Sequence, residues 1–101
     1  MNRSPDPPSA RRPEPAYPVP WVVDRRDRTH PMITNGGGEI RFVRVFARAS
    51  SDPGRTQLWG HVRGGDQMEV CLCDADVDDI VITLAWFRPE DGLEYVWRFV
   101  V

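Results

Sequence analysis

The chain has 101 residues, with 13 arginines, no lysine and a formal net charge of −2. This length accommodates one domain, and arginines interspersed with acidic residues do not resemble a nucleic-acid-binding tail. No stretch of 18 apolar residues is present and the first residues lack an apolar leader, so we expect neither a membrane span nor a secretory signal.

Residues 1–39 are predicted to form an extended arm ending in a glycine hinge. Eight of the ten prolines precede residue 32. Proline fixes φ and removes a backbone donor, which disfavours both helix and central strand. We therefore expect polyproline II or coil here. The run Asn35-Gly36-Gly37-Gly38 predicts a flexible joint, because glycine adopts any backbone region.

Two groups of residues in the arm are candidates for contact with a partner. The first is an apolar patch that could dock on a groove or on a sheet edge, or else belong to a loosely held linker. The second is an arginine cluster suited to bidentate hydrogen bonds with an acidic surface. Acidic residues between the arginines favour a protein surface or plain solvent over nucleic acid. The two groups are Trp21, Val22 and Val23, and Arg25, Arg26 and Arg28.

Residues 40–101 are predicted to form an antiparallel β-domain. The turn signals are Ser51–Gly54, Gly64-Gly65 and Pro89–Gly92. Short β-type segments with turns between them predict an all-β fold, a five-stranded small sandwich or barrel. The alternation changes phase between Phe42 and Val43, which indicates a bulge. The expected strands are Ile40–Ala49, Thr56–Arg63, Gln67–Cys73, Ile80–Arg88 and Leu93–Val101.

The fourth expected strand is apolar on both faces. Ile80, Ile82, Leu84 and Trp86 share one face, and Val81, Ala85 and Phe87 share the other. A sheet with one solvated face should alternate apolar and polar residues. The second face therefore needs a cover, which is the arm, the opposite wall of a sandwich or another subunit. Other residues expected on it are Trp59, Cys71, Cys73, Val96 and Val100, and Trp59 and Phe87 join the candidate partner contacts.

The residue types that carry chemistry predict no catalytic, cofactor or metal site. Cys71 and Cys73 are expected to be free, buried and apolar in character, because a zinc site needs further ligands and the two histidines are distant in sequence. His61 with one cysteine is the single nucleophile–base combination to weigh, and nothing supplies an orienting group. The segment Asp74–Asp79 lacks the glycine and glutamate of an EF-hand loop, so we expect a solvated acidic turn rather than a weak cation site.

The layout of Pro/Arg-rich arm, glycine joint and β-domain, with lysine-free composition, resembles the small accessory virion proteins of actinobacterial tailed phages. These include capsid decoration (cement) proteins and minor head or tail components. The resemblance implies a non-enzymatic structural protein in a virion, present in multiple copies or as a homo-oligomer. Its partner would be a protein lattice such as a major capsid or tail protein, and not nucleic acid or membrane. The alternatives are a cytoplasmic adaptor or inhibitor with a Pro-rich docking segment, and a small thiol hydrolase.

Overall fold

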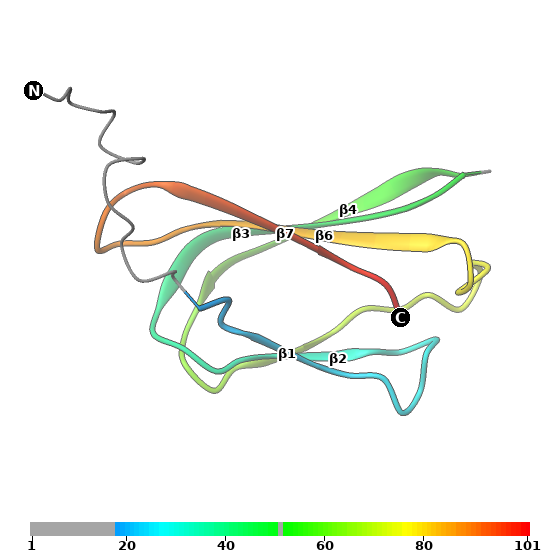
Figure 1. Cartoon of the computed structure of the whole chain (residues 1–101), viewed down its shortest axis with the longest axis horizontal. Coiled ribbons are helices and arrows are strands. Elements are labelled where there is room, and N and C mark those ends of the chain that lie inside the picture. Colours follow the sequence, from blue (N-terminus) through cyan, green and yellow to red (C-terminus); the bar gives the residue numbers. More distant parts are fainter. Residues whose placement is uncertain (1–17, 51) are drawn as a thin grey trace, which may run out of the picture.

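The computed structural model describes residues 18–50 and 52–101 and places them in two antiparallel sheets. One sheet has the strand order β1-β2-β5 and the other the order β4-β3-β6-β7, and they face each other (Figure 1). The predicted all-β antiparallel class is confirmed, but there are seven strands rather than five. The strands are β1 Trp21–Asp24, β2 Met32–Asn35, β3 Ile40–Ala49, β4 Asp52–Val62, β5 Gln67–Glu69, β6 Ile80–Phe87 and β7 Glu94–Phe99. Within the described part of the chain no helix is long and apolar enough to cross a membrane.

The two additional strands lie in the segment that we predicted as arm and hinge. β1 pairs with β2, and β2 pairs with β5. Pro20 and Pro31 immediately precede these strands, where the missing N–H does not interrupt a ladder. Strands β1 and β2, within residues 21–35, therefore form one sheet with β5 from the second half of the chain. The described residues do not separate into an arm and a domain at residue 39. The rest of the expected arm, residues 1–17, lies outside the described residues.

The glycine segment after β2 is a fixed turn rather than a flexible joint. The Asn35 side chain is fully buried. Its Oδ1 accepts a hydrogen bond from Gly37 N at 2.9 Å, and its Nδ2 donates to Gly38 O at 2.9 Å. A Cβ on Gly64 would lie only 2.5 Å from Gly37 O. The turn between β2 and β3 is thus packed against the turn between β4 and β5.

The phase change in the first predicted strand is a β-bulge, as expected. The register of β3 shifts against both neighbours around residues 41–43. Phe42 has a positive φ of 53°, a region that bulky residues rarely adopt. The bulge lets Ile40 and Val43 both face the core, while the Phe42 ring turns to solvent and is 50% exposed.

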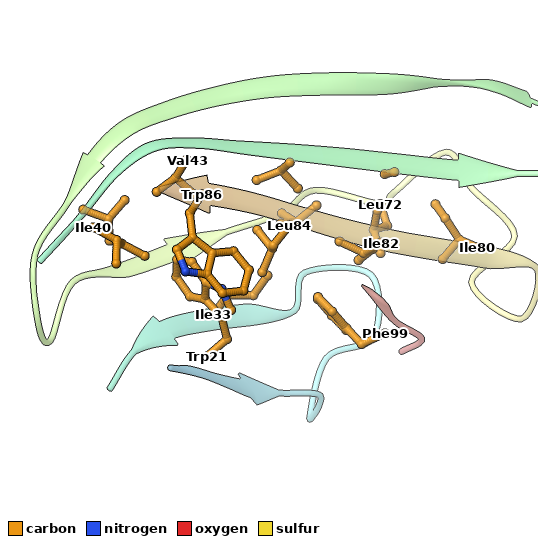
Figure 2. Packing of buried hydrophobic residues seen from close by; sticks show 14 residues of the cluster. Trp21, Ile33, Ile40, Val43, Leu72, Ile80, Ile82, Leu84, Trp86 and Phe99 are labelled. Atoms are coloured by element: carbon orange, nitrogen blue, oxygen red, sulfur yellow. The ribbon is translucent and has the colours of Figure 1, made fainter. Parts of the chain in front are cut away.

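The core lies between the two sheets (Figure 2). Trp21 from β1 meets Trp86 of β6 edge to face, with ring centroids 5.6 Å apart, and meets Trp59 of β4 at 6.2 Å. Trp59 is half-buried against the core, so it contributes little surface to a partner. The even-numbered residues of β6 all face inward, as predicted. The inner cluster includes Trp21, Ile33, Ile40, Val43, Leu72, Ile80, Ile82, Leu84, Trp86 and Phe99.

The predicted turn 89–92 joins paired strands, the Gly64-Gly65 turn does not, and the predicted turn Ser51–Gly54 overlaps the start of β4. The predicted turn 89–92 joins β6 to β7, with Gly92 N donating to Arg88 O at 2.7 Å. The Gly64-Gly65 turn instead carries the chain from one sheet to the other, because β5 pairs with β2 and not with β4. β4 also begins at Asp52 rather than Thr56. Its early start is accommodated by a register shift and by Gly54 at φ 102°.

Candidate functional site

The apolar patch predicted on the arm is mostly used inside the domain. Trp21 is only 6% exposed and sits in the core. Val23 is half-buried and packs against the same cluster. Val22 points the other way and is 61% exposed. Of these three candidate partner contacts, Val22 alone presents its side chain to solvent, because adjacent strand residues alternate between faces.

Two of the predicted arginines bind the end of β7. The Arg25 Nε donates to Val100 O at 3.0 Å. The Arg28 Nε donates to Val101 O at 2.9 Å, and its Nη2 forms an ion pair with Asp78 at 2.7 Å. These bonds tie the loop between β1 and β2 to the opposite sheet and to the acidic segment before β6. Arg25 and Arg28 thus have partners within the chain.

The Arg26 side chain is exposed and forms a local ion pair with Asp24. Its Nε lies 3.0 Å and its Nη2 2.5 Å from Asp24 Oδ2. The hydrogen bonds from Arg26 lower the pKa of Asp24 to about 2. Such a pair on the surface organises the loop locally and contributes little to overall stability.

The outer face of the four-stranded sheet carries exposed apolar and aromatic side chains around Arg44, which together we call the outer face patch. Strand register places Leu58, Arg44, Ala85 and Val96 side by side across β4, β3, β6 and β7. Leu58 is 65% and Val96 56% exposed. Ala85 between them is buried, so the exposed apolar surface of this row comes from its two outer strands. Single exposed apolar residues are ordinary, but Leu58 and Val96 lie near an aromatic pair and an arginine, residue types that are enriched at interfaces. The patch comprises Phe42, Arg44, Leu58, Ala85, Phe87 and Val96.

The bulge places an aromatic pair at one end of this patch. The Phe42 and Phe87 rings are stacked, with centroids 6.1 Å apart. The Arg44 guanidinium lies 4.4 Å from the centroid of the Phe42 ring and 5.6 Å from that of Phe87, and it binds Glu94 at 2.5 Å. Cation–π contacts of this kind hold the rings in a defined orientation. Phe87, which we predicted as a partner contact, lies on the solvent-facing side of this sheet. Its ring is half-buried because Phe42 and Arg44 pack against it.

The other end of the outer face is a shallow depression of about 830 Å³, lined by two arginines and by Asp79, whose carboxylate accepts hydrogen bonds from Ser50. Phe46, Val81 and Thr83 contribute to its floor, and Arg48 and Arg98 stand beside them. Both arginines are exposed, and neither has an ion-pair or hydrogen-bond partner among the described residues. Unpaired guanidinium groups beside apolar surface are suited to carboxylates on another molecule.

A second candidate site lies at the solvent face of the three-stranded sheet. The pairing of β2 with β5 continues as two backbone hydrogen bonds from segment 70–72 to segment 29–31, of 3.1 and 2.7 Å. In this register, in which Met32 opposes Glu69, His30 lies opposite Cys71. The sheet ladder therefore positions the imidazole beside the cysteines.

Both cysteines are exposed, contrary to our expectation that they are buried. The buried residues of this segment are Val70 and Leu72, which face the core. Since side chains alternate along an extended segment, Cys71 and Cys73 must face solvent together. The alternation was visible in the sequence, and the more apolar valine and leucine indicate the inner face.

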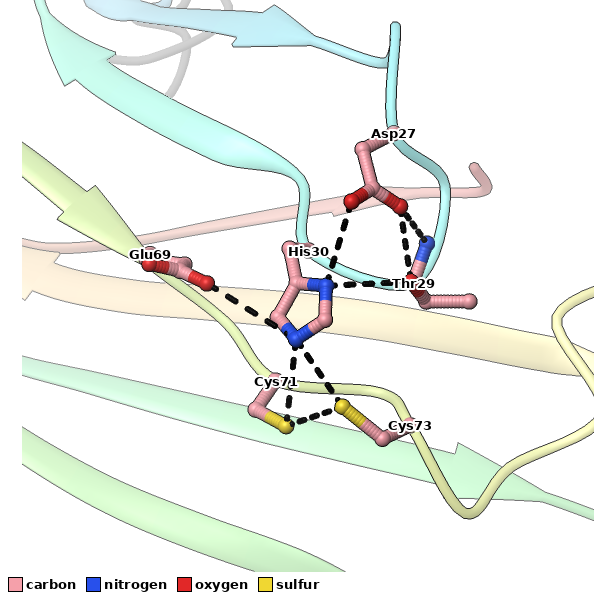
Figure 3. Close-up of polar contacts among 6 residues, drawn as sticks. All are labelled: Asp27, Thr29, His30, Glu69, Cys71 and Cys73. Carbon is pink, nitrogen blue, oxygen red and sulfur yellow. Dashed lines mark hydrogen bonds and ion pairs between the residues drawn. The ribbon is translucent and has the colours of Figure 1, made fainter.

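The two sulfurs converge on one nitrogen of His30 (Figure 3). The His30 Nε2 lies 2.9 Å from Cys73 Sγ and 3.8 Å from Cys71 Sγ. The sulfurs are 2.7 Å apart, longer than the roughly 2.05 Å of a disulfide bond. The hydrogen bond with Cys73 lowers the pKa of the Cys71 thiol and raises that of Cys73. We call these three residues the thiol–imidazole cluster.

A carboxylate orients the imidazole from its other side. The His30 Nδ1 is 3.2 Å from Asp27 Oδ2 and 3.0 Å from the Thr29 hydroxyl. Asp27 is itself held by the Thr29 backbone N–H at 3.0 Å. Hydrogen bonding to Asp27 raises the pKa of His30. We infer the tautomer with the proton on Nδ1, which turns the lone pair of Nε2 toward the sulfurs.

The histidine near the cysteines is not the one that the sequence suggested. His61 lies on β4 and pairs with Glu39 at 2.6 Å, and the hydrogen bond lowers the pKa of that carboxyl. His30 was rejected as a ligand because it is distant from the cysteines in sequence. Its proximity to the cysteines follows from the β2–β5 pairing, which no local pattern reveals.

Comparisons with known proteins yield no assignment. The chain has no match to a family model, and no significant match to a curated protein or to a solved structure. Function must therefore be argued from the two sites themselves.

Proposed function

We propose that this chain is a non-enzymatic structural protein that binds a protein partner through the outer face patch. The observation that carries the proposal is the placement of Phe42. Its positive φ of 53° is strained for an aromatic residue, and the ring is half-exposed rather than buried. Strained backbone that presents a side chain to solvent is commonly retained for function. Aromatic residues and arginine, which meet here, dominate the energetics of protein interfaces.

The chemistry of the face indicates what it binds. Leu58 and Val96 expose apolar surface on the two sides of Arg44 and Ala85, the aromatic pair lies at one end, and Arg48 and Arg98 lie at the other end. The complementary surface is apolar, with carboxylates at the end that meets these two arginines.

A second copy of this face fits less well than a different protein. In a two-fold symmetric contact the same patch lies on both sides of the interface. When the two-fold axis runs along the length of the patch, Arg48 and Arg98 of one copy meet the same arginines of the other, which opposes association. When it runs across the patch, they meet the aromatic end, where the Glu94 carboxylate is already paired with Arg44. A heterologous partner with acidic residues avoids this repulsion.

A repetitive assembly is the partner class that we favour, consistent with the composition and layout. A small domain with one binding face can occupy many equivalent sites on a capsid or tail lattice, and several copies together then bind with higher avidity. The virion location remains part of this proposal. Trp21, Arg25 and Arg28 have partners inside the domain. We therefore propose residues 1–17 alone as the tether to the assembly. The adaptor alternative depends on that same segment.

The proposal is tested by placing a charge on the outer face. Val96→Glu inserts a carboxylate into the outer face patch, and Val22→Glu is a matched control on the other sheet with nearly the same exposure. The tagged full chain is produced in the organism that encodes it, and extracts are fractionated on a density gradient. We expect the unchanged chain and Val22→Glu to sediment with a high-mass particle. Val96→Glu should lose at least about tenfold of that fraction, because an unpaired charge is costly to bury.

Two results would contradict the proposal. The first is equal retention of Val96→Glu and Val22→Glu, which would exclude the outer face as the contact. The second is an unchanged chain that stays monomeric throughout the gradient. If the unchanged chain sediments with a particle, a photo-cross-linking residue at position 58 identifies the partner protein. The same residue at position 22 should give no cross-link to that protein.

A further inference from the structure

We propose that His30, Cys71 and Cys73 bind a zinc ion, with Glu69 as the fourth ligand. This proposal is independent of the outer face patch, which lies on the other sheet. The site would be structural, joining the loop before β2 to the segment after β5.

The donor atoms are of the right kind and lie close together. Thiolate sulfur and imidazole nitrogen are the ligands that zinc prefers in proteins. Their three donor atoms all lie within 4.8 Å of one another. A tetrahedral ion with bonds of about 2.3 Å to sulfur and about 2.0 Å to nitrogen requires donors roughly 3.4 to 3.8 Å apart. The observed separations of 2.7, 2.9 and 3.8 Å reach this range by small side-chain rotations, which the exposed cysteines permit.

The surroundings of His30 match those of a metal ligand. Zinc-bound histidines usually donate their second N–H to a carboxylate, which fixes the ring and its tautomer. Asp27 occupies that position 3.2 Å from Nδ1, and Thr29 holds Asp27 in turn. The lone pair of Nε2 then points to where both sulfurs converge.

Glu69 completes the set from the same face of the chain. Residues 69, 71 and 73 alternate with the buried residues 70 and 72, so all three project outward. The Glu69 Oε2 lies 3.9 Å from His30 Nε2, slightly beyond the separation of two ligands on one ion, and rotation of this exposed side chain brings the carboxylate into the set. On binding, the thiols of Cys71 and Cys73 release two protons to solvent and form two zinc–sulfur bonds.

The convergence of both sulfurs distinguishes this site from a thiol nucleophile. A Cys–His–Asp catalytic arrangement needs one sulfur beside the imidazole. Here both Cys71 and Cys73 approach Nε2, and a carboxylate stands beside it. This is a coordination set rather than a nucleophile with its base.

Zinc binding is measured on the full chain after reduction with a phosphine and anaerobic buffer exchange. Zinc is titrated against a chromophoric chelator, and cobalt is added to a second sample as a spectroscopic substitute. We expect one zinc per chain and release of two protons. Cobalt should give a sulfur-to-metal charge-transfer band and intense tetrahedral d–d bands. Zinc should raise the midpoint of thermal unfolding, because binding only the folded state stabilises it.

Variants assign the ligands. Cys71→Ser and Cys73→Ser should each weaken zinc binding at least about 100-fold and reduce the charge-transfer band, because a hydroxyl is a poor zinc ligand. Asp27→Asn should weaken binding by about 10 to 100-fold while keeping the band. Glu69→Gln should weaken binding while leaving the sulfur bands in place. His61→Ala removes a histidine outside the cluster and should leave binding unchanged.

Several results would overturn the proposal. One is cobalt binding by the unchanged chain without a sulfur charge-transfer band. Another is zinc affinity unaffected by Cys71→Ser and Cys73→Ser, with circular dichroism showing that both variants fold. A third is a covalent thioester formed from p-nitrophenyl acetate with no zinc bound, which would indicate a nucleophile. Unchanged affinity in Glu69→Gln would refute the fourth ligand.

Discussion

Replacing Trp21 by alanine should destabilise the domain severely. The side chain is only 6% exposed and contacts Trp59 and Trp86 from the opposite sheet. A buried indole removes about 150 to 250 Å² from water, worth roughly 4 to 6 kcal/mol at about 25 cal/mol/Å². Measured truncations of buried aromatic residues cost about 3 to 5 kcal/mol. Small domains have only about 5 to 15 kcal/mol of unfolding free energy in total.

Urea unfolding of the full chain, followed by circular dichroism, measures this loss. With a slope of about 1 to 3 kcal/mol/M, the midpoint should fall by at least about 1 M, and the variant could be unfolded without urea. Val22→Ala is the matched control in the same strand, because Val22 is 61% exposed. Its cost should stay within about 0.5 kcal/mol. If Trp21→Ala and Val22→Ala have equal midpoints, β1 is not part of the core.

Two further predictions concern the turn packing and the exposed ion pair. Gly64→Ala should lower the free energy of unfolding by about 1 to 3 kcal/mol, because its Cβ would lie 2.5 Å from Gly37 O. Gly38→Ala is the control: its Cβ meets no atom within 4 Å, and the variant should be nearly neutral in the same urea assay. The Asp24 carboxyl should titrate by NMR near its lowered pKa of about 2 and return toward the ordinary 3.8 in Arg26→Gln. Since the folded-state pKa of Asp24 is lowered, the ion pair contributes its small stability above about pH 4 and loses it as the pH falls toward 2. An Asp24 pKa at the ordinary value in the unchanged chain would contradict the hydrogen bonds from Arg26.

Local patterns in the sequence were sufficient for several individual features of the four-stranded sheet, although not for the pairing of β3 with β6. The alternation in β6 placed Ile82 and Leu84 in the core, and the phase change beside Phe42 predicted the bulge. The turn before β7 was also located correctly. These features depend on residues within one strand or one turn, which sequence alternation reports directly.

The three-stranded sheet could not be predicted in the same way. Its strands β2 and β5 pair across about 35 residues, with Ile33 opposite Met68. The abundance of proline suggested an arm, yet Pro20 and Pro31 stand just outside the strands that they precede. The pairing of β2 with β5 depends on tertiary contacts, which the composition of a segment does not report.

The thiol–imidazole cluster was missed for the same reason. The pair Cys71 and Cys73 was recognised as a possible ligand pair, and it was rejected for lack of a histidine nearby. His30 is separated from them by about 41 residues in sequence but by one step across the ladder. Asp27 could be recognised as its orienting partner only after that ladder was known.

Hydrogen exchange in the purified chain tests most directly whether residues 21–35 fold together with the rest of the domain. Both the core contacts of Trp21 and the position of His30 depend on this. The amides of Asn35 and Leu72 donate to Asp66 O and to Thr29 O within the three-stranded sheet. The account predicts that these amides exchange slowly, with protection approaching that of the central strand β6. Exchange of both amides at the rate of an unfolded peptide, while β6 remains protected, would contradict it.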